Sequence, residues 1–311
     1  MTHKNLKYAA GIDLGGTFVK YALVSESGDI IVDGKFPIGG KARKEDTLNA
    51  MEESIQVIFT KANEKGVEIS GIGIGSPGII CDAVVLGGAD NLDGWENIDL
   101  GGHFSKKFGV PVLADNDANV MGLGEVAFGS AKECSDVIFI TVGTGIGGAI
   151  VANGKLYGGY QNRGAELGHV TINTKGIDCN CGGRGCLEAY ASTSALVASY
   201  AELTGKNEEE VDGKYIVKKF QEGEKEAVQC MEEHTDYLGH GIAGFINTFA
   251  PQKVVIGGGI SEAGKFYIDM IKKSALSYAM PDCSSNTDIV AATLGNNAGC
   301  LGAASLIFNR S

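Results

Sequence analysis

Several short stretches of the chain alternate apolar and polar residues and then end in glycine. The segment AAGIDLGGTFVKYALVSESGDII, residues 9–31, contains an apolar run, a glycine turn, an alternating run and a second turn. This order predicts a β-hairpin. Residues 69–78 predict a buried strand with a glycine-rich end, and residues 110–119 predict a strand that runs into a polar turn.

Helical spacing follows the hairpin and dominates the second half of the chain. In residues 47–66 the apolar side chains recur at intervals of three or four, which predicts an amphipathic helix. The second half predicts further helices at residues 194–203, 227–250, 262–279 and 296–309. Between two of them, KVVIGGGIS predicts a strand, a glycine turn and a helix start with Ser261 as its N-cap.

The opening pattern returns near the middle of the chain. Residues 136–157 repeat the order of apolar run, glycine turn, apolar run and turn, and Asp13 aligns with Thr141. Two halves that open alike predict a duplicated α/β protein with a cleft between its domains. An α/β protein with several unrelated hairpins is the alternative. We expect a smaller domain at residues 1–118 with the C-terminal helix 296–311, and a larger domain at residues 119–295.

Composition narrows the possible functions. The 311 residues carry a net charge of −12, which argues against a nucleic-acid partner or an anionic membrane surface. No run reaches the ~20 apolar residues of a membrane span, and the first residues lack the apolar core of a signal peptide. Eight cysteines are too sparse for a disulfide scaffold, so we expect a cytoplasmic protein. The 47 glycines are roughly twice the usual share and gather at the ends of apolar runs.

The first glycine turn, Asp13-Leu-Gly15-Gly16-Thr17, has the composition of a phosphate-binding turn. Two glycines at a strand end let backbone N–H groups approach a phosphate, and Thr17 adds a hydroxyl. Asp13 could hold Mg²⁺ directly or through water. A plain hairpin turn explains the motif equally well. The chain contains no Walker loop of the form GxxxxGK[ST].

Two further glycine turns extend this interpretation. Gly143, Gly145 and Gly148 have the spacing GxGxxG, but the residues that follow predict a strand, whereas a dinucleotide fingerprint needs a helix there. A second phosphate-binding turn fits better. The turn GGGIS, residues 257–261, could leave room for an adenine or a ribose, and a simple strand–helix turn explains it as well.

The motif DNDAN, residues 115–119, combines two carboxylates with two amides after a strand. A sugar hydroxyl that attacks phosphorus needs a carboxylate to accept its proton and amides to orient it. A polar turn that caps a helix is the alternative.

The loop around residues 164–190 gathers metal ligands. Cys179, Cys181 and Cys186, together with His169, provide the four soft ligands of a closed tetrahedral zinc site. No open coordination position is apparent, so we expect a structural metal. Glu166 and Glu188 flank the ligands.

Taken together, these motifs resemble the ROK family of sugar kinases and repressors. The resemblance covers nearly the whole chain in family order, and its most specific part is the His/Cys box followed by Glu188. It implies an actin-like/ribonuclease-H-like duplicated ATPase fold with ATP and a hexose in the interdomain cleft, and a homodimer.

The resemblance also implies a role for each candidate residue. Asp117 would be the general base, and sugar hydroxyls would bind to Asn91, Asn116, Asp117, Glu166, His169 and Glu188. The phosphates of ATP, with Mg²⁺, would lie on Asp13, Gly15, Gly16, Thr17, Gly143, Thr144 and Gly145. Adenosine would be flanked by Gly257, Gly258 and Gly259. Structural Zn²⁺ on His169, Cys179, Cys181 and Cys186 would order the sugar loop.

Glucose phosphorylated at O6 is the expected reaction. Fructokinases of the family tend to vary the cysteine box and the Glu-x-x-His pair, and both are intact here. Kinases of N-acetylmannosamine share the box and are the first alternative. The family's repressors carry a helix-turn-helix module ahead of the sugar domain, and the first glycine strand here begins close to the start of the sequence, so we expect no DNA binding. A sugar sensor without catalysis is the remaining alternative, which the presence of Asp117 argues against.

Overall fold

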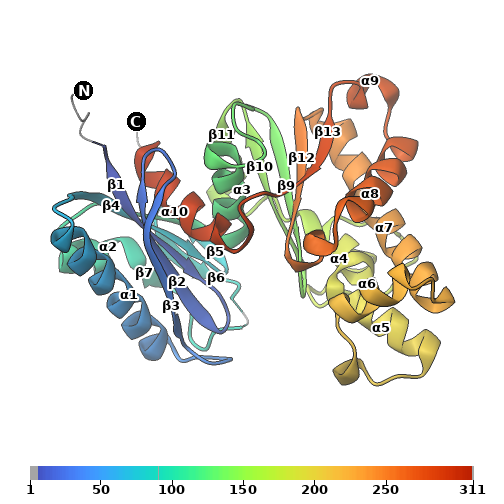
Figure 1. The fold of residues 1–311 in the computed structure, drawn as a ribbon, viewed down its shortest axis with the longest axis horizontal. Helices are drawn as coiled ribbons and strands as arrows, with labels where there is room; N and C mark the ends of the chain where they lie inside the picture. The colour runs from blue at the N-terminus through green and yellow to red at the C-terminus, as the bar shows by residue number, and fades with distance from the viewer. Residues whose placement is uncertain (1–5, 90, 310–311) are drawn as a thin grey trace. The chain divides into compact units, whose positions relative to one another are not determined.

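The computed structural model describes residues 6–89 and 91–309, which form two compact units (Figure 1). The first unit comprises the chain up to Glu133, Leu156–Gly164 and the chain from Leu294 onward; the second comprises Cys134–Lys155 and Ala165–Thr293. The chain therefore passes between the units at 133/134, 155/156, 164/165 and 293/294.

A five-stranded sheet in the order β3-β2-β1-β4-β8 organises the first unit. Its first three strands form an antiparallel meander, β4 pairs in parallel with β1, and β8 pairs in parallel with β4. A small antiparallel sheet of β5, β6 and β7 lies in the same unit. The elements of the unit are β1 (Tyr8–Leu14), β2 (Phe18–Ser25), β3 (Ile30–Pro37), α1 (Lys44–Glu64), β4 (Ile69–Ser76), β5 (Ile79–Cys81), β6 (Val84–Gly87), β7 (Ile98–Asp99), α2 (Leu100–Phe108), β8 (Val112–Asn116), α3 (Asp117–Phe128), the 3₁₀ turns Tyr160–Asn162 and Gly295–Asn297, and α10 (Ala298–Phe308).

Alternate residues of β1 pack into two separate hydrophobic clusters. Ala10 and Ile12 pack in one cluster with Met51 of α1, whereas Ala9 packs in another with Leu301 of α10. Successive side chains of a strand point to opposite faces, so α1 and α10 cover the two faces of this sheet (Figure 1).

Two glycines allow α10 to lie unusually close to its neighbours. A Cβ atom at Gly73 of β4 would be 1.7 Å from the carbonyl oxygen of Ala303, and one at Gly302 would be 1.6 Å from that of Val120 in α3. No side chain can occupy either position. The close crossing places α3, whose first residue is Asp117, in the first unit with α10.

The second unit repeats the strand order of the first. Its sheet has the order β11-β10-β9-β12-β13. In it β9 and β10 are antiparallel, β12 pairs in parallel with β9, and β13 pairs in parallel with β12. Its elements are β9 (Val137–Val142), β10 (Ile146–Ala152), β11 (Lys155–Leu156), the 3₁₀ turn Leu167–His169, α4 (Leu187–Ala191), α5 (Thr193–Thr204), the 3₁₀ turn Glu208–Glu210, α6 (Gly213–Gln221), α7 (Lys225–Phe249), β12 (Lys253–Gly257), the 3₁₀ turn Gly259–Ala263, α8 (Lys265–Tyr278), α9 (Pro281–Ser284) and β13 (Asp288–Ala291).

The predicted duplication is confirmed at the level of register. Asp13 of β1 pairs in parallel with Gly75 of β4, and Thr141 of β9 pairs in parallel with Gly257 of β12. The two residues that align in sequence therefore hold equivalent positions in the two sheets. The predicted α/β fold class is correct.

Helices of the second unit form one core with its sheet. Apolar residues of β9 and β12 share a cluster with those of α7 and α8. The predicted N-cap at Ser261 is wrong, because the chain forms a 3₁₀ turn there and α8 begins only after Gly264, whose φ of 117° interrupts the helix. Among the described residues, no helix combines the length and apolarity needed to cross a bilayer.

Candidate functional site

The candidate residues divide between the two units. Those at the ends of β1 and β8 and in the loop before β7 belong to the first unit, and those of the second glycine turn, the cysteine loop and the end of β12 belong to the second. The candidate residues of each unit are described in turn.

At the end of β1, Asp13 is buried beside a lysine. Its side chain is 5% exposed, and the Nζ atom of Lys20 on β2 lies 3.3 Å from Oδ2. Burial raises the pKa of Asp13, and the charge of Lys20 acts in the opposite direction. A buried carboxylate of this kind is stabilised by a cation, so Asp13 fits a position close to a divalent metal ion.

The first glycine turn is tight and lies against a predicted sugar ligand. The N–H of Gly15 donates to the carbonyl of Phe18 at 3.0 Å. A Cβ atom at Gly16 would be 3.0 Å from Nδ2 of Asn91. The loop that carries Asn91 is anchored four residues further on. There the indole N–H of Trp95 donates to Oγ of Ser76 at 2.9 Å. The fold therefore brings Asn91 to the Asp13–Thr17 turn.

The DNDAN motif both caps a helix and presents a carboxylate. Oδ1 of Asn116 accepts hydrogen bonds from the N–H groups of Ala118 (2.9 Å) and Asn119 (3.4 Å). Asp117, the first residue of α3, remains partly exposed. A helix N-terminus favours a negative charge, so this end of α3 is a favourable place for a carboxylate.

The two carboxylates of the motif differ in environment. Asp115 accepts hydrogen bonds from the Nδ2 group of Asn119 and the N–H of Asn116, both at 2.7 Å, and burial raises its pKa. Asp115 thus holds the motif together. The Nδ2 group of Asn116 donates to the carbonyl of Gly78 at 3.0 Å, so this predicted sugar ligand also has a structural role.

In the second unit, Glu188 holds the second glycine turn. Its Oε2 accepts a hydrogen bond of 2.8 Å from the N–H of Ile146, and a Cβ atom at Gly145 would be 2.4 Å from the same oxygen. The turn is closed by the N–H of Gly143, which donates to the carbonyl of Gly145 at 2.9 Å. A predicted sugar ligand therefore touches a predicted phosphate turn.

A cavity of about 770 Å³ opens beside this turn. It is lined by Gly143, Thr144 and Gly259, and by residues of α5 and α6 that include Val197 and Val217. Its size suits a nucleoside. The sequence motifs indicate the glycine wall, but nothing in the sequence marks the wall from α5 and α6, because it forms only when these helices pack together.

The other two predicted adenosine glycines serve packing. A Cβ atom at Gly258, whose φ is 90°, would be 2.1 Å from the carbonyl of Val142. One at Gly257 would be 2.9 Å from the ring of Phe139. These glycines let the end of β12 lie close to β9, while Gly259 reaches the cavity.

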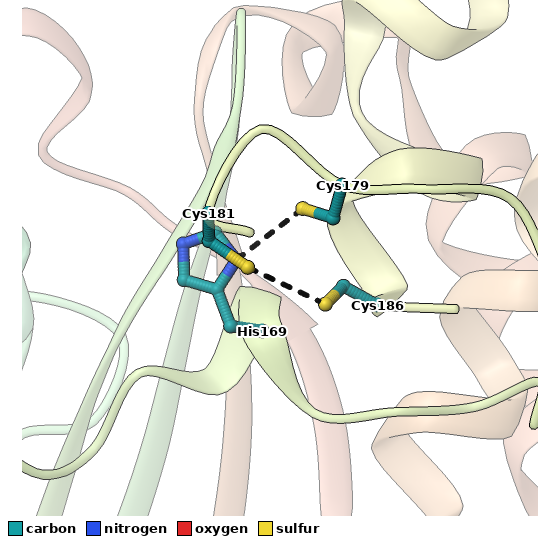
Figure 2. Close-up of side chains that lie close together, drawn as sticks. All are labelled: His169, Cys179, Cys181 and Cys186. Atoms are coloured by element: carbon teal, nitrogen blue, oxygen red, sulfur yellow. Dashed lines mark hydrogen bonds between the residues drawn. The ribbon is translucent and has the colours of Figure 1, made fainter. Parts of the chain in front are cut away.

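His169, Cys179, Cys181 and Cys186 come together as four potential metal ligands (Figure 2). Their ligand atoms all lie within 4.8 Å of one another. The Sγ atoms of Cys181 and Cys186 are 3.7 Å apart, and Nδ1 of His169 is 3.8 Å from Sγ of Cys179. Two thiolates on a tetrahedral zinc ion are separated by about 3.8 Å, given a Zn–S bond of ~2.3 Å. The residues present therefore fit a zinc ion.

The electrostatics of the cluster also suit a cation. Burial and the neighbouring thiols raise the pKa of Cys186 to about 12. This thiol ionises at neutral pH only when a positive charge lies beside it. Nδ1 of His169 faces the cluster, so Nε2 is the ring nitrogen that remains for another partner.

The cluster is connected to both flanking glutamates by short segments. Cys186 is the residue before α4, and Glu188 lies in the first turn of that helix. Glu166 precedes the 3₁₀ turn that ends at His169, and its carbonyl accepts the N–H of His169 at 3.0 Å. Ordering the cluster therefore orders the backbone of Glu166 and Glu188.

Comparison with known proteins places these features in a family. The model of the ROK family matches residues 9–310. The chain is 36% identical to a glucokinase of Thermotoga maritima, over 96% of the chain and 97% of that protein. It is 30% identical to a xylose repressor of Bacillus spizizenii, over 98% of the chain and 78% of the repressor.

A solved structure supports the fold. The ROK family glucokinase of Streptomyces griseus, in complex with glucose and AMPPNP, superposes with a TM-score of 0.80 at 32% identity. The alignment covers 96% of this chain and 98% of that one.

Proposed function

This chain belongs to the ROK family, and from that membership we propose that it transfers the γ-phosphoryl group of ATP to a hexose, with glucose and its O6 hydroxyl as the first candidate. The observation that carries the proposal is the partly exposed Asp117 carboxylate at the N-terminus of α3. The relatives support a kinase of sugars, since a glucokinase aligns over nearly its whole length.

Asp117 is the general base of this reaction. Its carboxylate accepts the proton of the sugar hydroxyl as the oxygen attacks the γ-phosphorus, and the bond from that phosphorus to the bridging oxygen of ADP breaks. Asn116 fixes the start of α3 through its hydrogen bonds to Ala118 and Asn119. The carboxylate is thereby held in one position before the sugar arrives.

The two glycine turns receive the phosphates of ATP. Backbone N–H groups of Gly16, Thr17 and Thr144 can donate to phosphate oxygens. Gly15 and Gly143 shape the two turns through their own hydrogen bonds to Phe18 and Gly145. Bound Mg²⁺ would neutralise the charge that develops on the phosphoryl oxygens, and Asp13 is the residue that would hold it. Adenosine occupies the cavity beside Gly259.

We propose that amides and carboxylates hold the sugar. We assign its hydroxyl contacts to Asn91 and Asn116, and to Glu166, Glu188 and Nε2 of His169. Structural Zn²⁺ on the His169 cluster would keep these groups in place and so lower the entropy lost on binding. The same arrangement would serve a sugar sensor, and a xylose repressor is among the relatives, but a sensor does not require a general base.

Release of ADP from Mg·ATP tests the proposal. We expect turnover with glucose to exceed that with mannose, N-acetylmannosamine, N-acetylglucosamine, fructose or allose. Asp117→Asn should retain sugar binding and reduce kcat by about 10²–10⁴-fold. Sugar binding without ADP release for any hexose would establish the sensor instead, and a normal kcat in Asp117→Asn would remove this residue as the base.

A further inference from the structure

A second cavity, of about 870 Å³, lies in the second unit and has no part in the proposed chemistry. Residues of α4, α5 and α7 line it, together with the chain around Ile177 and Asn207. Its volume is in the range of small-molecule sites.

Helix α5 separates this cavity from the one proposed for adenosine. Val197 lines the adenosine cavity, whereas Leu196 and Ser199 line the second cavity. Glu208 and Glu209, in the 3₁₀ turn after α5, line both. The two cavities therefore lie on different faces of one helix and share part of their wall.

A buried histidine among the lining residues has an unused hydrogen-bonding atom. His234 of α7 lines the second cavity and is 2% exposed, and its Nε2 lies 2.8 Å from the hydroxyl of Tyr267. Its Nδ1 has no partner among the protein groups that the structure describes. An unpartnered buried polar atom is unfavourable and rare in folded proteins. This nitrogen therefore indicates a ligand group in the cavity.

The protonation state of His234 indicates which kind of group that is. Burial lowers the pKa of His234 to about 3, so the imidazole is neutral at pH 7. When the ring proton is on Nε2 and is donated to the hydroxyl of Tyr267, Nδ1 carries a lone pair and accepts a hydrogen bond. The ligand group that suits Nδ1 is then a hydrogen-bond donor.

The charges around the cavity narrow the choice of donor. Four carboxylates line it, those of Glu202, Glu208, Glu209 and Glu233, against one amine, that of Lys206. The ion pairs of the described residues in this unit use other carboxylates. The cavity therefore repels anions and attracts cations.

Two tyrosines add aromatic surface to the cavity. Tyr190 and Tyr237 both line it, with their ring centroids 4.7 Å apart. The hydroxyl of Tyr190 accepts the N–H of Ile177 at 2.8 Å, which holds this ring in place. Aromatic rings attract organic cations and pack against their aliphatic parts.

We propose that this cavity is a second small-molecule site, for an organic amine that carries its positive charge on an alkyl chain. Ammonium N–H groups donate to Nδ1 of His234 and to carboxylates such as that of Glu233. The alkyl chain lies against Tyr190 and Tyr237. The site itself does not depend on the proposed kinase function.

Calorimetric titration of the nucleotide-free protein with 1,4-diaminobutane tests the site. The control ligand is 1,4-butanediol, which has the same chain without the charge, and the salt concentration is held constant. We expect the diol to bind about tenfold or more weakly than the diamine, because it lacks the charge-assisted hydrogen bonds.

Two neighbouring glutamates provide a matched pair of variants. Glu233→Gln should weaken the diamine about tenfold or more, because it removes a charged acceptor from the cavity wall. Glu232→Gln, at an exposed position of the same helix that does not line the cavity, should leave the affinity unchanged. Calorimetry with the same diamine measures both.

The ring nitrogens of His234 give a second readout that needs no stable variant of the wall. Comparison with His234→Gln identifies their signals in ¹⁵N spectra. We expect Nδ1 to be unprotonated in the free protein and its signal to shift when the diamine is added.

The shared wall also predicts coupling between the two cavities, and this part rests on the proposed function. A bound diamine offsets the charge of Glu208 and Glu209, which otherwise repels an anionic nucleotide. We expect the diamine to tighten AMPPNP about two- to fivefold, and AMPPNP to tighten the diamine by the same factor. Equal AMPPNP affinity with and without diamine would overturn the coupling.

The site is overturned if the diamine does not bind, if the diol binds as well, or if Glu233→Gln and Glu232→Gln behave alike. A protonated Nδ1 in the free protein would also overturn it. If the protein binds no AMPPNP, the proposed function fails. The titration without nucleotide still decides whether the cavity takes an amine.

Discussion

At the scale of single residues, Glu188 illustrates how one side chain serves two parts of a site. One carboxylate oxygen holds the N–H of Ile146 and with it the second glycine turn. The segment that carries Glu188 follows directly from Cys186, one of the four potential metal ligands. Under the proposed function, Glu188 would couple sugar recognition to the position of a phosphate-binding turn.

Substitutions of Glu188 should separate these two roles. Glu188→Gln keeps an oxygen for Ile146 but loses the charge, so KM for the sugar should rise about 10–100-fold while KM for ATP stays nearly constant. Glu188→Ala also leaves Ile146 without its acceptor, so KM for ATP should rise too. Steady-state kinetics with each substrate varied in turn checks this, and equal effects of the two variants on ATP would contradict it.

At the scale of elements, the crossing of α3 and α10 determines where Asp117 lies. The two helices approach so closely that the carbonyl of Val120 occupies the place of a side chain at Gly302. This contact at Val120, about one turn after Asp117, fixes the position of the start of α3. A small change at this crossing should be costly.

Gly302→Ala is expected to lower the unfolding free energy by about 3 kcal/mol, because backbone cannot move aside as a side chain can. Gly244→Ala in α7 is the control. A Cβ atom there meets nothing within 4 Å, and alanine should add about 0.5–1 kcal/mol by its higher helix propensity. Thermal unfolding of both variants checks the pair, and a fully stable Gly302→Ala protein would contradict the observed approach.

The cysteine loop is the other element whose position has a testable cause. We expect about one zinc ion per chain by metal analysis, and Cys181→Ser should lose it and weaken hexose affinity about tenfold or more. Cys134, which lies outside the cluster, provides the control, since Cys134→Ser should retain the metal. Unaltered protein without zinc would exclude this assignment.

At the scale of the whole molecule, the stability of the protein should depend on a buried histidine in the second unit. His234 of α7 is 2% exposed, and its Nε2 is 2.8 Å from the hydroxyl of Tyr267. Burial lowers its pKa from 6.5 to about 3. Between these two pH values His234 is protonated in the unfolded chain but neutral in the folded protein. The free energy of unfolding therefore falls as the pH decreases through this range.

His234→Gln should remove that dependence. The loss of unfolding free energy between pH 7 and pH 5 should be smaller than in the unaltered protein by about 2 kcal/mol. His240→Gln, at an exposed position of the same helix, should leave the loss unchanged. Urea unfolding at the two pH values provides the measurement, and parallel behaviour of all three proteins would disprove the role of His234.

Much of the candidate site could be predicted because its signals are local. The glycine turns follow strands, and Cys179, Cys181 and Cys186 lie close enough in the chain to meet through a tight loop. The residues that sequence reasoning missed act over long separations. Glu125 and Leu294 are 169 positions apart, and nothing near either residue marks their hydrogen bond. The cavity wall from α5 and α6 is equally invisible, since apolar helix residues pack in many ways.

The sequence alone determined the repeated strand–turn–strand units and the cluster of four potential metal ligands, because short-range spacing and side-chain period fix these features. Tertiary structure decided that the N–H of Ile146 donates to Glu188, how closely α3 and α10 cross, and that the N–H of Leu294 donates to Glu125. Those outcomes depend on backbone segments from distant parts of the chain that pack together. The residue pattern of one strand or helix does not specify which distant segment will pack against it.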